Sequence, residues 1–232
     1  MPNVTHAPEA TQHAGLAEPA TTATPRRRLE HPALVRLLQR AYSAERAASF
    51  AYIGHAASLR DPAEKAKIKE IEDDEWAHRR HVLAIMRQHD VPVSRWFEVK
   101  YYFIGKLIGA SCHVIGWFMP YFFAGKLESG NVCEYFVMMR YFRELGLREH
   151  DAVLYEMGIK EKEHEVYFLE QVKRSRWLPL FEKVFSWGRA HSRNDVDLEA
   201  KYLVEDGPLY CPGHGAAGSN ASAGNKLVRE RA

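Results

Sequence analysis

Apolar residues recur at three- and four-residue spacing in several long segments of this 232-residue chain, between about residue 35 and residue 172. That spacing places apolar side chains along one face of an α-helix. The same region shows no convincing alternation of apolar and polar residues, which is the pattern of half-buried strands. We therefore predict an all-α fold. With 46% hydrophobic residues, the chain can build one substantial core.

Proline and glycine residues divide this region into four long predicted helices. The first ends just before Pro62, which can occupy the first turn of the second helix. The second ends before Pro92, because the residue preceding a proline disfavours the α conformation. The third follows Pro120 and ends at Gly146, and Asp151 is the expected N-cap of the fourth. This order predicts two helical hairpins joined by a long crossover.

The crossover, residues 96–124, is the most apolar part of the chain. Residues 107–124 contain no Asp, Glu, Lys or Arg, and the length of this stretch is borderline for a membrane span. A span there would separate the two hairpins and prevent the shared site described below. We therefore expect this segment to be buried or to lie at an interface. Residues that interrupt helices favour a broken or bent helix here: Gly105, Gly109, Gly116 and Pro120.

The composition of the two chain ends and the balance of charges indicate one folded domain and give no sign of a nucleic-acid partner. Residues 1–30 and 191–232 are rich in small and polar residues, so we predict a disordered arm and a flexible tail around one domain at residues 31–190. The 32 basic and 30 acidic residues are mixed along the chain, which gives no reason to expect nucleic acid. The N-terminus lacks the apolar segment of a secretory signal, and we expect a cytoplasmic protein.

Two Glu-x-x-His motifs carry the chemistry. Glu75 and His78 lie in the second predicted helix, and Glu161 and His164 lie in the fourth. Residues at i and i+3 share a helix face, so each motif can aim a carboxylate and an imidazole at one centre. One such motif is common on solvated helices. Two of them, each in the second helix of a hairpin, match two-metal carboxylate bundles, in which the other two helices each add a glutamate.

The other two predicted ligands are glutamates that lie at the same level along a hairpin as the Glu-x-x-His motif. The level is measured by the number of residues from the turn. Glu45 and Glu75 lie at nearly equal numbers of residues on either side of the turn near Asp61. At a rise of about 1.5 Å per residue they return to the same level, so they can share a metal. In the second hairpin the same comparison favours Glu134 as the partner of Glu161.

Glu128 stays open as the weaker choice in the third helix. It lies six residues before Glu134, about 9 Å along the axis and on another face, so the two cannot serve interchangeably. Tyr141 follows Glu134 by seven residues, as Tyr52 follows the first-helix glutamate, which also favours Glu134. We expect these tyrosines and Tyr167 to point inward, towards the ligands. Acidic residues out of phase with the motifs are expected mainly as solvated charges: Asp73, Asp74, Glu163 and Glu165.

These residues resemble those of the demethoxyubiquinone hydroxylase family, the ferritin-like di-iron monooxygenases of ubiquinone biosynthesis. The likeness covers most of residues 35–172, in the segments AERAASFAYIGH, EDDEWAH, GKLES, CEYFVMMRY and EKEH. It implies a ferritin-like four-helix bundle with a long apolar crossover between the second and third helices. Ala44, Ala47 and Tyr135 depart from the family pattern. The resemblance makes six residues iron ligands: Glu45, Glu75, His78, Glu134, Glu161 and His164.

The activity implied by this resemblance is that of a di-iron, oxygen-activating enzyme, a monooxygenase that hydroxylates an apolar, quinone-like substrate. The expected cofactor is two iron ions, with manganese left open. The expected partners are dioxygen, the substrate and an external electron donor. Peripheral contact with the inner face of a membrane and a homodimer stay open. The alternative is a ferroxidase or a peroxide-scavenging protein of the ferritin-like or rubrerythrin-like kind, although the chain has no cysteine pairs of the rubredoxin type.

Overall fold

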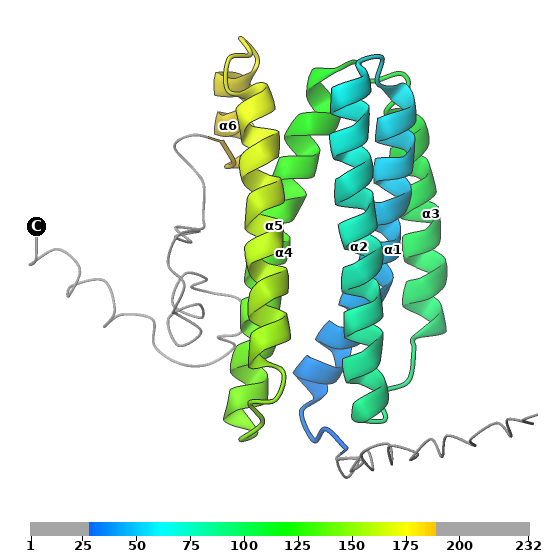
Figure 1. The fold of residues 1–232 in the computed structure, drawn as a ribbon, viewed down its shortest axis with the longest axis vertical. Coiled ribbons are helices and arrows are strands. Elements are labelled where there is room, and N and C mark those ends of the chain that lie inside the picture. Colours follow the sequence, from blue (N-terminus) through cyan, green and yellow to red (C-terminus); the bar gives the residue numbers. More distant parts are fainter. Residues whose placement is uncertain (1–27, 189–232) are drawn as a thin grey trace, which may run out of the picture.

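The computed structural model of the chain describes residues 28–188, and within them the fold is entirely helical, as the periodicity predicts. Apart from residues 28–30, the two predicted disordered ends lie outside the described residues. Figure 1 shows the six helices: α1 (Pro32–Ser58), α2 (Pro62–Gln88), α3 (Arg95–Ser111), α4 (Phe118–Glu144), α5 (Asp151–Val172) and α6 (Leu178–Phe185).

The helix ends follow local sequence signals. The Asp61 side chain caps α2 by accepting hydrogen bonds from the backbone N–H groups of its first turn, and Pro62 is the first residue of that helix. Gly146 has a φ of 72° just after the end of α4, which is the conformation that favours glycine there. The prediction for Asp151 was wrong by one position. His150 is the N-cap, and the Asp151 carboxylate instead accepts a hydrogen bond from Arg143 at 3.0 Å.

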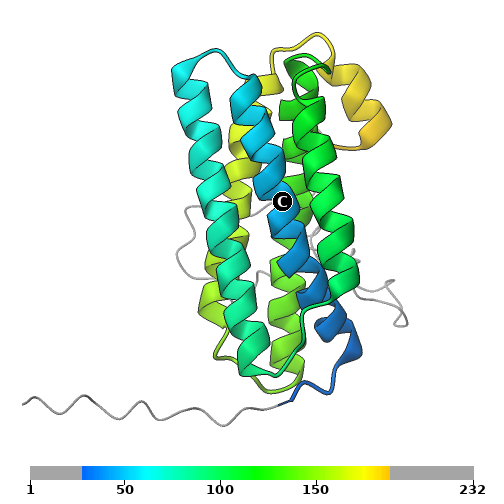
Figure 2. The ribbon, with the colours of Figure 1, turned by 90° about the vertical axis from the view of Figure 1, so that its right-hand side faces the viewer.

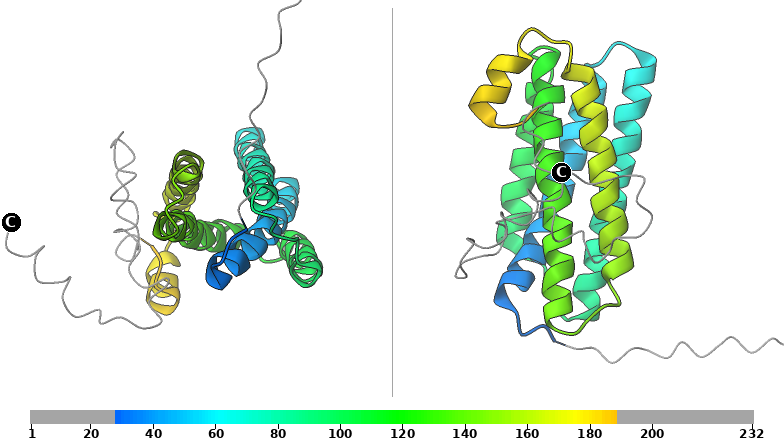
Figure 3. Two further views of the ribbon diagram at one scale, coloured as in Figure 1. Left: turned by 90° about the horizontal axis from the view of Figure 1, so that it is seen from below. Right: turned by 90° about the vertical axis from the view of Figure 1, so that its left-hand side faces the viewer.

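The long helices form two antiparallel hairpins, α1–α2 and α4–α5, that lie side by side along one axis (Figures 1 and 2). Helix α3 connects them and packs against α1, on the side of α1 remote from α5. The view along the axis in Figure 3 shows the two hairpins facing each other. Four long helices can therefore present side chains to a common interior.

Two apolar clusters fill that interior at different heights. One contains the N-terminal half of α1 with the facing ends of the other long helices, and its largest members include Leu34, Leu38, Met86, Phe136 and Phe142. The other lies towards the opposite end, with Tyr52, Ile68, Tyr121, Phe122, Phe168 and Trp187. On every long helix the residues between these clusters include buried acidic or histidine side chains. The polar site therefore has apolar packing above and below it.

Two glycines of α3 allow close contact with α1. A Cβ atom at Gly105 would lie 2.6 Å from the backbone oxygen of Ala47, and one at Gly109 would lie 2.7 Å from that of Phe50. The expectation that these glycines mark a broken helix was wrong, since α3 is continuous through both. The break falls at Gly116, with a φ of 79°, between α3 and α4.

The Gly54→Ala variant is expected to lower the free energy of unfolding by about 1–3 kcal/mol, because overpacking forces backbone shifts. A Cβ at Gly54 would lie 2.3 Å from the Cα of Gly109, which cannot move aside as a flexible side chain can. Gly130→Ala is the matched control, since a Cβ there meets nothing within 4 Å; it should raise stability by about 0.5–1 kcal/mol through helix propensity. Urea denaturation measures both. Equal stability of the two variants would contradict the close contact of α1 and α3.

The outer face of α3 is apolar and exposed, so this part of the crossover is not buried within the chain, and its expected place at an interface stays a prediction. Only Gly105 and Gly109 of this helix are buried. Trp96, Phe103 and Leu107 are 70%, 66% and 72% exposed. Among residues 28–188, none of the helices combines the length and the hydropathy needed to cross a bilayer.

His55 lies buried beside the ring of Tyr121, and its Nε2 atom has no hydrogen-bond partner. Burial lowers its pKa to about 4, compared with about 6.5 in an unfolded chain. The unfolded state therefore binds the proton more tightly. The stability that depends on neutral His55 is complete above about pH 6.5 and is lost as the pH falls to about 4.

A His55→Phe variant is expected to lose less stability than the wild type between pH 6.5 and pH 4, by about 3 kcal/mol. Phenylalanine keeps a ring in the core and cannot be protonated. Chemical denaturation at a series of pH values measures the difference between the two proteins. Parallel pH profiles would contradict the burial of a neutral imidazole.

Candidate metal centre

Six buried acidic and histidine side chains meet between the apolar clusters. Each is at most 4% exposed. Helices α1 and α4 each contribute one glutamate, and α2 and α5 each contribute a glutamate and a histidine one turn apart. Burying so many ionisable groups is costly unless they pair with one another or coordinate a metal. The six are Glu45, Glu75, His78, Glu128, Glu161 and His164.

The six side chains form two overlapping groups of potential metal ligands. Glu45 and His78 belong to one group, and Glu128 and His164 belong to the other. Glu75 and Glu161 belong to both. Within each group the ligand atoms all lie within 4.8 Å of one another. This arrangement offers two adjacent cation positions with two shared carboxylates.

The atoms without hydrogen-bond partners are those that would bind a metal. Both carboxylate oxygens of Glu75 and of Glu161 are buried without such a partner, and so are the Nδ1 atoms of His78 and His164. His78 Nδ1 lies 2.9 Å from Glu161 Oε1, and His164 Nδ1 lies 3.4 Å from Glu75 Oε1, in both cases without hydrogen-bond geometry. Carboxylate and imidazole donors suit iron and manganese. The residues present therefore fit a pair of such ions.

The electrostatics of the cluster also favours cations. Burial, and next the Glu75 carboxylate, raise the pKa of Glu45 well above its ordinary value. Burial likewise raises the pKa of Glu128. Burial opposes ionisation of Glu161, but the nearby imidazoles of His78 and His164 outweigh it and lower that pKa. The close packing of these carboxylates therefore opposes ionisation of all of them together, and bound cations would offset their negative charge.

Two tyrosines hold the outer glutamates through a reciprocal pair of hydrogen bonds. Tyr52 of α1 donates to Glu128 of α4, and Tyr135 of α4 donates to Glu45 of α1. Each tyrosine follows the glutamate of its own helix by seven residues, which returns it to nearly the same helix face. Asn131 donates a further hydrogen bond to Glu128 Oε2 at 3.0 Å. These contacts orient the carboxylates and tie the two hairpins together.

Asp74 orients one of the histidines. Its Oδ2 atom lies 3.1 Å from Nε2 of His164. A proton on Nε2, donated to this carboxylate, leaves the Nδ1 lone pair facing Glu75 and Glu161. The expectation of Asp74 as a solvated charge therefore missed its role. Nothing in the local sequence indicates this contact, since the two residues are 90 positions apart.

The same expectation was wrong for Glu165. This residue is 1% exposed. Its carboxylate pairs with Lys162 at 2.9 Å and accepts a hydrogen bond from Trp187 Nε1 at 2.9 Å. It therefore joins α5 to the segment that follows α6. Glu163, in contrast, is exposed as expected.

Glu134, the residue favoured from helix height, lies outside both ligand groups. Its carboxylate pairs with Arg40 at 3.0 Å, and its side chain is 19% exposed. Glu128, left open as the weaker choice, lies in the cluster instead. The height comparison failed because the face of the helix matters more than a few residues of axial level. Six residues rotate a side chain by about 240°, whereas a glutamate can reach across part of the axial offset.

The tyrosine spacing was the useful signal, but it was applied to the wrong glutamate. Tyr135 follows Glu128 by seven residues and lies in the core, 1% exposed. Tyr141 is only partly buried and lies against the ring of His31, with 4.4 Å between ring centroids. Tyr167 is also only partly buried and lies near Tyr121. Of the three tyrosines expected to face the ligands, only Tyr52 contacts one of the six buried side chains.

Comparison with known proteins identified no relative: no protein-family model, curated protein or solved structure matches the chain. The resemblance to the demethoxyubiquinone hydroxylase family therefore rests on the sequence segments quoted above. The case for a metal centre rests on the geometry of the six buried side chains.

Proposed function

We propose that α1, α2, α4 and α5 form a ferritin-like four-helix bundle that binds two iron ions, and that the protein is an oxygen-activating oxidoreductase. The observation that carries the proposal is the pair of overlapping ligand groups that share Glu75 and Glu161. Di-iron and di-manganese carboxylate bundles have this ligand set: two helices each supply one carboxylate, and the other two each supply a Glu-x-x-His motif. Glu45 and His78 would bind one ion, and Glu128 and His164 would bind the other.

The protein's own groups hold this ligand set in place. When bound, reduced iron supplies electrons and open coordination positions for dioxygen. Tyr52 and Tyr135 fix the outer carboxylates, and Asp74 fixes the His164 ring. The apolar clusters on either side restrict the access of water. A dry, rigid surrounding of this kind limits side reactions at an oxidising centre.

We propose an apolar, quinone-like substrate and an external electron donor. The support is the exposed apolar face of α3, a helix that packs on the outer side of α1 and whose first turn is held beside the residues that follow two of the ligands. Glu98 of α3 pairs with Arg46 of α1 and Arg79 of α2, at 2.9 Å in each case. Arg46 directly follows Glu45, and Arg79 directly follows His78. The three charges therefore hold α3 at the height of the metal ligands.

Oxygen consumption tests the proposal. The reduced, iron-loaded wild type is expected to consume dioxygen at least about tenfold faster than the Glu161→Ala variant, since removing a ligand of both ions removes the reactive centre. A short-chain quinone added with a chemical reductant should gain one oxygen atom, as measured by mass spectrometry. Equal rates in the two proteins would refute the oxidoreductase. Fast iron oxidation without modification of the quinone would instead favour a ferroxidase.

A further inference from the structure

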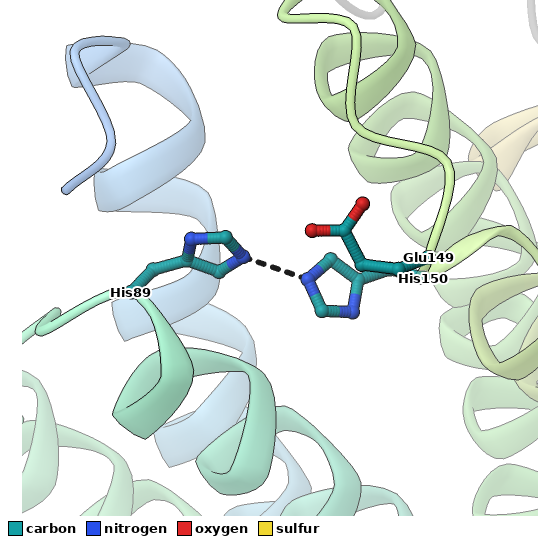
Figure 4. Close-up of side chains that lie close together, drawn as sticks. All are labelled: His89, Glu149 and His150. Carbon is teal, nitrogen blue, oxygen red and sulfur yellow. Dashed lines mark hydrogen bonds between the residues drawn. The ribbon is translucent and has the colours of Figure 1, made fainter. Parts of the chain in front are cut away.

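A second group of potential metal ligands lies far from the candidate metal centre, at the end of the hairpins where α2 stops and α5 begins. It consists of His89, Glu149 and His150, whose ligand atoms lie within 4.8 Å of one another. Figure 4 shows the two imidazole rings facing each other, with the carboxylate of Glu149 beside His150. His89 is 1% and His150 is 4% exposed, whereas Glu149 is exposed. The group is thus a buried pair of imidazoles with a carboxylate on the solvent side.

The two histidines cap the adjoining ends of α2 and α5, roughly in line with the helix faces that carry the candidate metal ligands. His89 follows His78 by eleven residues, and His150 precedes Glu161 by eleven. Eleven residues are about three turns of helix, or about 16 Å along the axis. The faces of α2 and α5 that meet at the candidate metal centre therefore meet again at this pair. His89 and His150 therefore join the two hairpins at one end, about three helical turns away from the candidate metal centre.

The two imidazoles are close enough to bind one metal after a small movement apart. Their Nε2 atoms lie 2.7 Å apart. Two nitrogens bound to tetrahedral zinc at about 2.0–2.1 Å lie roughly 3.3–3.4 Å apart, so the rings would need to separate by about 0.6 Å. Phe142 packs against both rings, with centroids 5.5 Å from His89 and 4.6 Å from His150. Both rings therefore contact the same aromatic side chain, which helps to hold them close together.

The residue types suit a metal. The imidazole nitrogen of histidine is a common zinc ligand, and here two imidazoles meet in a buried position. Glu149 is on the exposed side and can supply a negative charge without a large desolvation cost. Two histidines and a carboxylate are a ligand set that zinc accepts, with water in the fourth position.

We infer that His89, Glu149 and His150 form a second metal site, of the zinc class, that joins the two hairpins at the end remote from α6. Without a metal, the two Nε2 atoms are joined by a hydrogen bond, which requires one ring to donate and the other to accept. A hydrogen bond of that kind would not respond to zinc. The inference does not depend on the proposed oxidoreductase, because it involves none of its ligands.

Zinc binding to the full-length, metal-stripped protein tests the inference. The wild type is expected to retain one more zinc per chain than His89→Gln or His150→Gln, measured by elemental analysis after gel filtration. Zinc at about a hundredfold excess over its Kd should raise the melting temperature of the wild type by roughly 5–10 °C more than that of His89→Gln. His81→Gln replaces an exposed histidine of α2 and should behave like the wild type.

Replacing the exposed ligand, Glu149, tests the site without disturbing the buried core, so a loss of zinc binding cannot be attributed to misfolding. Glu149→Gln should leave the zinc-free melting temperature unchanged and weaken zinc binding at least about fivefold, while Glu156→Gln, an exposed control on α5, should not. The Glu161→Ala variant should lose zinc from the candidate metal centre and still respond at this site, so failure of one site is distinguishable from failure of the other. Equal zinc content and equal thermal response in the wild type, His89→Gln and Glu149→Gln would overturn the inference.

Discussion

Replacement of Glu161 by alanine is expected to abolish binding of both proposed metal ions. Its carboxylate belongs to both ligand groups, and both of its oxygens are buried without a hydrogen-bond partner. Losing it deprives each cation of a ligand and leaves His78 without its nearest carboxylate, at 2.9 Å. Elemental analysis of protein loaded anaerobically with ferrous iron measures the effect. We expect two irons per chain in the wild type and almost none in the variant.

Glu128→Ala and Glu134→Ala form a matched pair that tests which glutamate of α4 is the ligand. Both replace a glutamate of the same helix, six residues apart. Glu128 lies in one ligand group, so its loss should remove about one iron per chain. Glu134 pairs with Arg40 near the surface, so its loss should leave both irons and change stability by less than about 1 kcal/mol. Iron loss in Glu134→Ala but not in Glu128→Ala would restore the assignment made from helix height.

Loading with metal is expected to raise the melting temperature by roughly 8–16 °C for each ion bound. A ligand that binds only the folded state, at a thousandfold excess over its Kd, stabilises by about 4 kcal/mol. For a chain of this size each kcal/mol raises the melting temperature by about 2–4 °C. The physical source is the cluster of buried carboxylate oxygens and imidazole nitrogens that lack hydrogen-bond partners. Calorimetry of the metal-free and the loaded protein measures the difference.

The control for this measurement is the Glu161→Ala variant, which should melt at the same temperature with and without metal. Manganese in place of iron avoids oxidation during heating and suits the same donors. A wild type whose melting temperature does not respond to either metal would show that the six buried side chains are satisfied without cations. The proposed function would then lose its main support, while the zinc test at His89 and His150 would be unaffected.

The sequence alone determined the features that depend on neighbours along the chain. Helix periodicity predicted an all-α fold, and Pro62 and Gly146 marked helix ends that the structure confirms. The two Glu-x-x-His motifs could also be found from the sequence, because they depend only on residues that are close along the chain. A spacing of three residues on a helix brings side chains together whatever the rest of the molecule does.

Contacts between helices were decided only by the tertiary structure, because they depend on how each helix is rotated and tilted against its neighbours. A side chain moves by about 100° around the axis with each residue, so a small error in packing angle brings a different glutamate into the core. The inclusion of Glu128 rather than Glu134, the contact of Asp74 with His164, and the pairing of His89 with His150 all depend on that rotation. The sequence determined the four long helices and the residues that carry charge on them, and the packing of the hairpins decided which of those charges meet.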